Sequence, residues 1–166
     1  DVDDLGADPA AAAARAGKMS RDKNRTPMQW SAGPNAGFCP PTVAPWLPVN
    51  PNYAQGVNVA DQQDDPASML TYYRGLIRAR RQLPALVAGA YRPLHERARS
   101  YLAFLRETPE QTVLVALNYS ARRRALRFDV PGKTAGRIRF SSHPRAEEFR
   151  LDGLRLEPFE AVIAEL

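Results

Sequence analysis

The sequence is poor in cysteine and histidine, and it has no long hydrophobic run. Cys39 is the single cysteine and two histidines accompany it among 166 residues, which excludes an internal disulfide and disfavours a Cys/His zinc site. No apolar stretch approaches the roughly 18 to 20 residues that a membrane-spanning helix needs. We therefore expect no bound metal, no cofactor and no membrane partner.

Length and composition set further limits. Hydrophobic residues make up 44% and charged residues 25% of the chain, which is typical of a globular protein and excludes wholesale disorder. A complete (β/α)8 barrel needs roughly 200 residues or more, so a chain of this length does not form one by itself. The acidic stretch Asp1 to Asp4 is unlike a secretory signal, and we expect a cytoplasmic location.

Lysine is also scarce, so arginine carries nearly all of the positive charge, and the net charge is +5. The one basic run is Arg122 to Arg124. Such a run could bind phosphate, but no aromatic platform or glycine-rich loop accompanies it, which favours a solvated turn between strands. We therefore expect no nucleic-acid partner.

Proline and alanine organise the first third of the chain. The alanines after Asp8 predict a short helix through about Met19, because alanine is the best helix former. Residues 20–63 hold seven prolines between Pro27 and Pro51. Such a stretch cannot keep a regular backbone hydrogen-bond pattern, so it predicts a long loop.

Residues 64–83 form the clearest predicted helix. Two acidic residues and Pro66 suit its first turn, and Pro84 would end it. Apolar residues at helical spacing form a stripe that has to be covered; its members are Met69, Tyr73, Leu76 and Ile77.

Residues 90–166 predict short strands separated by turns. Polar and apolar residues alternate over 101–106, 125–130 and 137–141. Residues 113–119 are almost continuously apolar, as in a strand buried on both faces or a strand in a sandwich core. A hairpin turning at Asp152 and Gly153 and a last strand at 161–164 complete the set. This pattern is typical of an antiparallel sandwich.

Three motifs follow one another in the proline-rich loop: Arg-Thr-Pro-Met-Gln-Trp (25–30), Pro-Asn-Ala-Gly-Phe (34–38) and Trp-Leu-Pro-Val-Asn-Pro (46–51). In this order and spacing they closely resemble the C-terminal part of the α-glucosidase branch of glycoside hydrolase family 13. That branch includes oligo-1,6-glucosidases, sucrose isomerases and trehalose synthases. The resemblance covers roughly residues 18–166.

The resemblance implies a fragment of a (β/α)8 barrel followed by an all-β antiparallel Greek-key sandwich, called domain C in the family. Residues 1–89 would be the C-terminal remnant of the catalytic barrel. They would comprise the short helix, the proline-rich loop 20–63 after barrel strand 8, and the last barrel helix, 64–83. Residues 90–166 would be domain C.

The family cleaves or transfers glycosides with retention, using an Asp nucleophile and a Glu acid/base about 5 Å apart. In the family these residues precede the loop seen here, so we expect no catalytic residue in this chain. The arginine of Arg-Thr-Pro would bind the terminal glucose, which implies Arg25 as a substrate-binding residue, with Arg21 as the alternative. A planar guanidinium can bind a carboxylate and sugar hydroxyls together. The alternative is that the arginine only anchors the loop through a salt bridge. Asp22 is expected to structure the loop.

The aromatic residues of the loop, Trp30, Phe38 and Trp46, have two interpretations. Their faces could stack on sugar rings. We favour the other interpretation, in which they form a loop core packed on the barrel rim, because large aromatics carry most of the buried area in such loops.

We therefore predict the C-terminal segment of an α-glucosidase-like retaining glycoside hydrolase that acts on short α-glucosides and is inactive alone. The alternative is a stand-alone carbohydrate-binding or interaction module built on the sandwich. The apolar stripe of residues 64–83 predicts association with the missing barrel segment or with a second copy of the chain. Linkage specificity, and the choice between hydrolysis and isomerisation, would depend on barrel loops outside these residues.

Overall fold

A computed structural model describes residues 24–166. The chain divides into two compact units between Thr71 and Tyr72. The predicted helix ending near Met19 and two of the residues singled out above, Arg21 and Asp22, lie outside the described residues.

The described part of the first unit contains three short helices where the sequence predicted an uninterrupted loop over 20–63. They are the 3-10 helices η2 (Pro34–Gly37) and η3 (Pro51–Gln55) and the α-helix α2 (Val59–Gln63). Both 3-10 helices begin at a proline, whose fixed φ suits a first helical turn. Asparagines cap two of them: the side chain of Asn50 accepts from the Asn52 N–H, and that of Asn58 from the Asp61 N–H. The loop prediction was therefore wrong for these short segments.

The predicted helix 64–83 begins later than expected. Helix α3 spans Met69–Gln82, and its first turn is capped by Ser68, whose Oγ accepts from the Thr71 N–H at 3.1 Å. Asp65 instead closes a turn before the helix, accepting from the Ala67 N–H at 2.8 Å. Pro84 starts a separate helix, α4 (Pro84–Ala88), because its missing N–H is tolerated only in a first helical turn.

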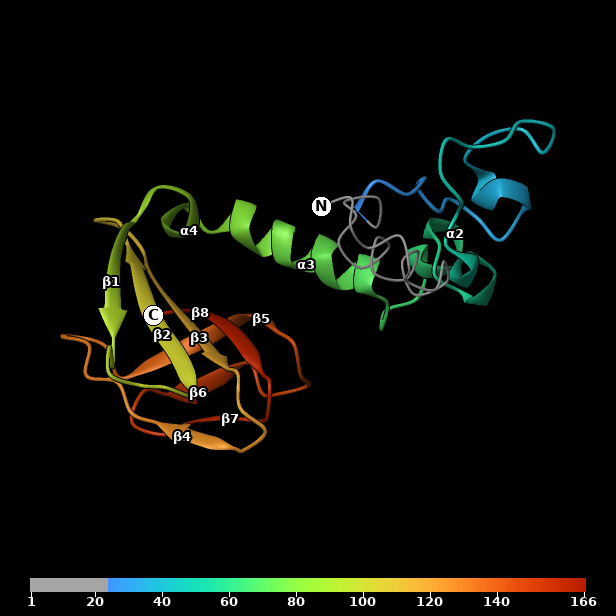
Figure 1. Ribbon diagram of the computed structural model, residues 1–166. Coiled ribbons are helices and arrows are strands. Elements are labelled where there is room, and N and C mark those ends of the chain that lie inside the picture. The colour runs from blue at the N-terminus through green and yellow to red at the C-terminus, as the bar shows by residue number, and fades with distance from the viewer. Residues whose placement is uncertain (1–23) are drawn as a thin grey trace, which may run out of the picture. The chain divides into compact units, whose positions relative to one another are not determined.

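The second unit contains two antiparallel sheets, shown in Figure 1. The larger has six strands in the order β1-β2-β3-β8-β5-β6, and the smaller pairs β4 with β7. The strands are β1 (Ala90–Leu94), β2 (Tyr101–Glu107), β3 (Thr112–Asn118), β4 (Arg124–Leu126), β5 (Ala135–Ser141), β6 (Glu148–Arg150), β7 (Leu154–Leu156) and β8 (Ala161–Glu165).

One predicted pairing was wrong. The chain does turn at Asp152 and Gly153, but the strands on either side do not form a hairpin. β6 pairs with β5 in the large sheet, whereas β7 pairs with β4 in the small one. The buried side chain of Leu151, 2% exposed, lies at this crossing and joins the core between the sheets.

Two apolar clusters lie on opposite faces of the large sheet. The first fills the space between the sheets, where alternate residues of β2, β3 and β8 meet Leu126, Leu154 and Leu156 of the small sheet. The second lies between the large sheet and α4, where Leu83 and Leu86 meet Val113 and Ile163. The predicted burial of β3 on both faces is confirmed, since the neighbouring residues Val113 and Leu114 are both fully buried.

This packing explains why the second unit starts inside α3. Leu76 packs on the same cluster as α4, and the ring of Tyr72 lies 5.3 Å from that of Phe140 on β5. Most of α3 is thereby attached to the sheet. The domain boundary after residue 89 was predicted from the family resemblance and stays a prediction.

Among residues 24–166, no helix combines the length and hydropathy needed to span a bilayer.

A bidentate ion pair joins β1 to β2. Nε and Nη2 of Arg92 donate to the two carboxylate oxygens of Glu107 at 2.8 and 2.9 Å. These hydrogen bonds favour the charged form and hold the pKa of Glu107 below its ordinary value. The pair therefore stabilises the fold at neutral pH, and its contribution is lost as the pH falls through the lowered pKa.

Replacing Arg92 with methionine tests this pair. We expect the free energy of unfolding to fall by less than about 1 kcal/mol at neutral pH, because both side chains are partly exposed to solvent. The difference from the wild type should vanish once Glu107 is protonated in both proteins. Urea unfolding at neutral and at strongly acidic pH measures this, and an equal difference at both would contradict the assignment.

Candidate functional site

Hydrogen bonds from Gln29 and its neighbour Trp30 connect the first motif to later parts of the loop. The backbone carbonyls of these two residues accept from the N–H groups of Val59 and Ala60, each at 3.0 Å. The side chain of Gln29 donates to Oδ1 of Asn52 at 2.9 Å. Three stretches of the proline-rich segment are thus joined without a regular helix or sheet between them.

The second motif forms a tight turn. Asn35, Ala36 and Gly37 follow one another with φ of 51°, 54° and 69°, in the left-handed region. The carbonyl of Ala36 accepts from the N–H groups of Trp30 and Ser31 at 2.8 and 3.0 Å. The Asn35 amide donates to the Pro40 and Val43 carbonyls at 3.0 and 2.9 Å. The left-handed conformation is energetically unfavourable for Asn35 and Ala36, which are not glycine, and these hydrogen bonds offset that cost.

The third motif brings an aromatic side chain to Arg25. Nε1 of Trp46 donates to the Arg25 carbonyl at 3.0 Å, and the Trp46 ring lies 5.7 Å from that of Phe38, tilted by 60°. Together with Thr26 and Leu47, Arg25 and Trp46 line an open pocket of about 560 Å³. The predicted substrate-binding residue therefore lies in a hollow made by two of the three motifs.

The aromatic side chains of the loop do not bury one another. Trp46 is 73% exposed and Trp30 is 51% exposed, while Phe38 is half-buried. The described residues therefore leave both tryptophan side chains largely uncovered. Their packing on a barrel rim stays a prediction.

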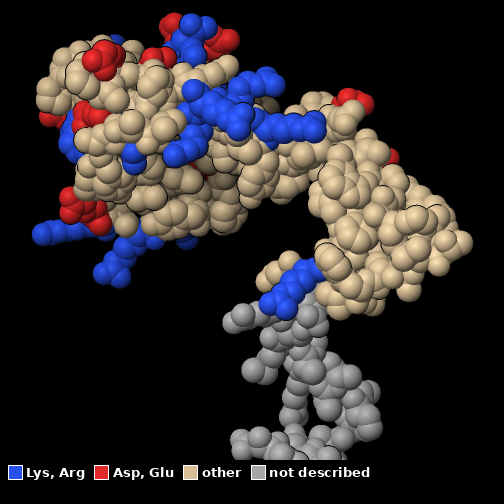
Figure 2. All heavy atoms as spheres, turned by 90° about the horizontal axis from the view of Figure 1, so that it is seen from above, with Lys and Arg blue, Asp and Glu red and all other residues tan. Residues whose placement is uncertain are grey.

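Charge is distributed unevenly between the described parts of the two units. Figure 2 shows most positive and negative side chains on the second unit, and Arg25 is the one basic residue of the stretch 24–71. A hollow of about 380 Å³ beside β5 is lined by three arginines. Each faces a carboxylate: the pairs are Arg137–Glu147 at 3.2 Å, Arg139–Glu165 at 3.8 Å and Arg145–Glu160 at 2.7 Å. This hollow is therefore not a site of unbalanced positive charge.

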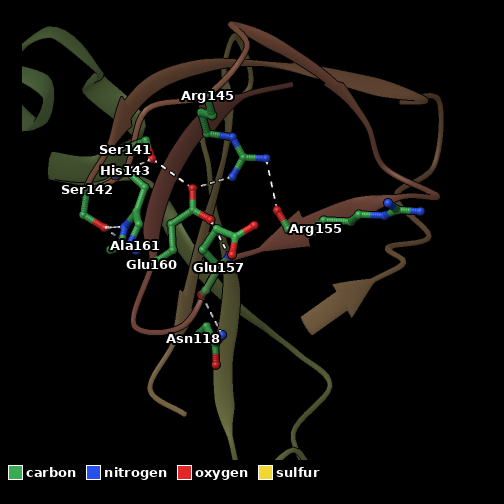
Figure 3. A network of polar contacts seen from close by, with 9 residues as sticks. All are labelled: Asn118, Ser141, Ser142, His143, Arg145, Arg155, Glu157, Glu160 and Ala161. Atoms are coloured by element: carbon green, nitrogen blue, oxygen red, sulfur yellow. Dashed lines mark hydrogen bonds and ion pairs between the residues drawn. The ribbon is translucent and has the colours of Figure 1, made fainter. Parts of the chain in front are cut away.

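A buried polar network, which the sequence analysis missed, surrounds Glu160 (Figure 3). Its carboxylate, 2% exposed, accepts from Nη1 of Arg145 at 2.7 Å, from Oγ of Ser141 at 3.0 Å and from the Glu157 N–H at 2.7 Å. Beside it, the buried amide of Asn118 donates to the Glu157 carbonyl at 2.7 Å. No local pattern marks Glu160 as buried, since it follows an exposed turn in the sequence.

The network has the residue types of a catalytic triad but not its geometry. The ring of His143 is hydrogen-bonded to Ser142 at 3.0 Å, and Ser142 in turn accepts from the Ala161 N–H. Ser141 is bonded to the acid and to the His143 backbone, not to the imidazole. A nucleophile needs a base within hydrogen-bond reach and a third group that orients the base. Here the base His143 reaches Ser142, but the carboxylate of Glu160 is bonded to Ser141 and not to the imidazole. We therefore interpret the network as structural: it joins the ends of β3, β5 and β8.

Metal ligands do not converge in the described part of the chain. Among residues 24–166, no group of three or more His, Cys, Asp or Glu side chains lies close enough to hold an ion. Cys39 is a free thiol, and its sulfur accepts weakly from the amide of Asn35 at 3.4 Å.

Known proteins are similar to this chain in sequence and fold. The family model described as "Alpha amylase, catalytic domain" matches residues 2–89. The oligo-1,6-glucosidase of Parageobacillus thermoglucosidasius is 34% identical over 162 residues, and the match covers 96% of this chain and 28% of that protein. A probable oligo-1,6-glucosidase 2 of Bacillus subtilis is 44% identical over 101 residues, covering 61% of this chain and 18% of that protein.

Solved structures agree with these relatives. The trehalulose synthase MutB of Pseudomonas mesoacidophila superposes with a TM-score of 0.80 at 33% identity, covering 99% of this chain and 29% of that one. A variant of the isomaltulose synthase of Erwinia rhapontici superposes with a TM-score of 0.73 at 36% identity, covering 88% of this chain and 26% of that one.

The chain spans less than a third of the length of each of these relatives. The similarity nevertheless extends over nearly the whole chain: the catalytic-domain model matches residues 2–89, and the superposition with MutB also includes the β-sheet unit. The chain belongs to the alpha-amylase family, glycoside hydrolase family 13, in the branch of oligo-1,6-glucosidases and sucrose isomerases.

Proposed function

We propose that these residues are the C-terminal segment of a retaining α-glucosidase-like enzyme that acts on short α-glucosides. The pocket formed by Arg25, Thr26, Trp46 and Leu47 carries the proposal. Relatives named oligo-1,6-glucosidase and a MutB variant crystallised with the substrate sucrose support this class of substrate. The nucleophile and the acid/base would come from barrel residues outside this chain, and the chain would be inactive alone.

Arg25 is the proposed substrate-binding residue. Its side chain is exposed, its backbone is held by the indole of Trp46, and no other basic residue lies within 24–71. A guanidinium fork can donate to sugar hydroxyls and to a barrel carboxylate at once. Arg21, the alternative, lies outside the described residues.

The sheet unit would support the barrel as domain C. Its strand order, with β8 between β3 and β5, fits the proposed Greek-key connection. Tyr73 and Ile77 of α3 are 55% and 49% exposed, which supports a partner surface on this helix. We propose the remaining barrel as that partner, ahead of a second copy of the chain, and a cytoplasmic location for the enzyme.

Turnover by the native protein tests the proposal. The gene product that contains these residues should release glucose from isomaltose, or rearrange or cleave sucrose. Replacing Arg25 with alanine should lower kcat/KM by about 10- to 100-fold, because a charge-assisted hydrogen bond contributes roughly 1.5 to 3 kcal/mol. An exposed arginine between β1 and β2 provides the control, and Arg97→Ala should leave kcat/KM unchanged. Equal turnover by the two variants would overturn the role of Arg25.

The alternative function is a carbohydrate-binding or interaction module without turnover. One observation favours it: the second unit closes its own apolar core between two sheets. Under this alternative, the 166-residue chain would bind maltose or sucrose saturably, and the native gene product would cleave neither. Turnover in the native protein would rule this alternative out.

A further inference from the structure

We propose that Trp46 is a stacking platform for a pyranose ring, so that the third motif binds sugar beside Arg25. The inference rests on the proposed function and assigns a second residue to the same pocket. Four features of the first unit carry it: the exposure of the indole, its fixed orientation, its aromatic support and the donors next to it.

The exposure of Trp46 sets it apart from an ordinary loop residue. Its side chain is the most exposed of the large hydrophobic side chains in residues 24–166. Covering an apolar surface of this size with a ligand is favourable, because it removes that surface from water. A sugar ring presents apolar C–H faces, which match the face of an indole in shape and polarity.

The indole is held in one orientation before any ligand arrives. Its N–H is bonded to the Arg25 carbonyl, and the ring of Phe38 supports it from within the loop. The Asn35 amide bonds to the Val43 carbonyl, three residues before Trp46, and so ties this part of the loop to the left-handed turn. A preorganised platform loses little conformational freedom on binding, which favours affinity.

Hydrogen-bond donors stand at the edge of the platform. The pocket lined by Trp46 and Leu47 also includes Arg25 and the hydroxyl-bearing Thr26. Apolar walls with a few polar groups that fix orientation are the usual composition of a small-molecule site. Trp30 is also exposed, but it does not line this pocket, and it therefore serves as the internal comparison.

The two tryptophans make the test direct, because the chain contains no others. In the Trp30→Phe variant, all indole fluorescence comes from Trp46. Titrating this variant with maltose should change the emission saturably, whereas glycerol at the same concentration should not. Calorimetry should give wild-type and Trp30→Phe the same maltose affinity.

Removing the platform should weaken binding. We expect Trp46→Ala to lower the maltose affinity by about 3- to 10-fold, the range of an aromatic stacking contact, and Trp46→Phe to retain most of it. Because the side chain is exposed, thermal unfolding should be nearly unchanged in both variants. Unaltered affinity in Trp46→Ala, or maltose binding that leaves the Trp46 emission unchanged, would overturn the proposal.

The outcomes separate this inference from the proposed function. If the native protein turns over α-glucosides but the chain shows no maltose binding that depends on Trp46, the inference fails and the proposed function stands. If Trp46 binds maltose and the native protein has no turnover, the inference stands and the proposed function fails.

Discussion

Replacing Glu160 with alanine is expected to lower the free energy of unfolding by about 4 kcal/mol, which is typical for removing one partner of a buried ion pair. The carboxylate accepts from Arg145, from Ser141 and from the Glu157 N–H. The side chain of Arg145 is only 17% exposed, so alanine would leave a mostly buried guanidinium without a counter-charge. Buried donors left unsatisfied add to the cost.

Urea unfolding of the two proteins measures this loss. Glu157→Ala is the matched control, because within residues 24–166 the only partner of its side chain is the exposed Arg123. We expect that change to cost less than about 1 kcal/mol, as for an exposed ion pair. If Glu160→Ala and Glu157→Ala destabilised the protein equally, the network would not be the stabilising element that its geometry indicates.

Replacing Gly89 with alanine is expected to cost about 3 kcal/mol, the upper end of the usual range for overpacking. A β-carbon there would lie 2.5 Å from the Ala85 carbonyl oxygen and 2.8 and 3.0 Å from the backbone N and O of Glu107. These are main-chain atoms of α4 and β2, so neither can move without disturbing a helix end or a strand. The φ of Gly89 is −67°, which any residue can adopt, so close approach is the reason for glycine here.

Gly153→Ala provides the control for this position. A β-carbon at Gly153 would meet nothing within 4 Å, so alanine should be neutral or slightly stabilising through the unfolded chain. Thermal or urea unfolding of both variants measures the difference. A loss below about 1 kcal/mol for Gly89→Ala would mean that α4 can move away from β2 at little cost.

Local sequence patterns predicted much of this fold correctly. Alternation placed β2 and β5, and the apolar run at 113–119 identified β3, the strand that is buried on both faces. Alternation did not predict β1 or β6, and only the first part of the stretch 125–130 belongs to a strand, β4. Pro84 was correctly predicted to end helix α3, because proline has no backbone N–H to donate to the preceding turn. The order of the three loop motifs indicated the family to which the chain belongs.

The errors occurred where local rules compete. Asp65 and Pro66 satisfied the rules for a helix start, but Ser68 caps α3. Asp152 and Gly153 satisfied the rules for a hairpin, but β6 and β7 belong to different sheets, because Leu151 is drawn into the core between them. In both cases several local conformations were permitted, and packing selected one of them.

Tertiary structure alone decided the remaining features. The burial of Glu160, the contact of Gly89 with β2 and the exposure of Trp46 beside Arg25 all depend on residues distant in sequence. Propensity, capping and motif order act over a few neighbouring residues and can be inferred from the chain itself. Burial and the pairing of charges arise only when separate segments meet in space.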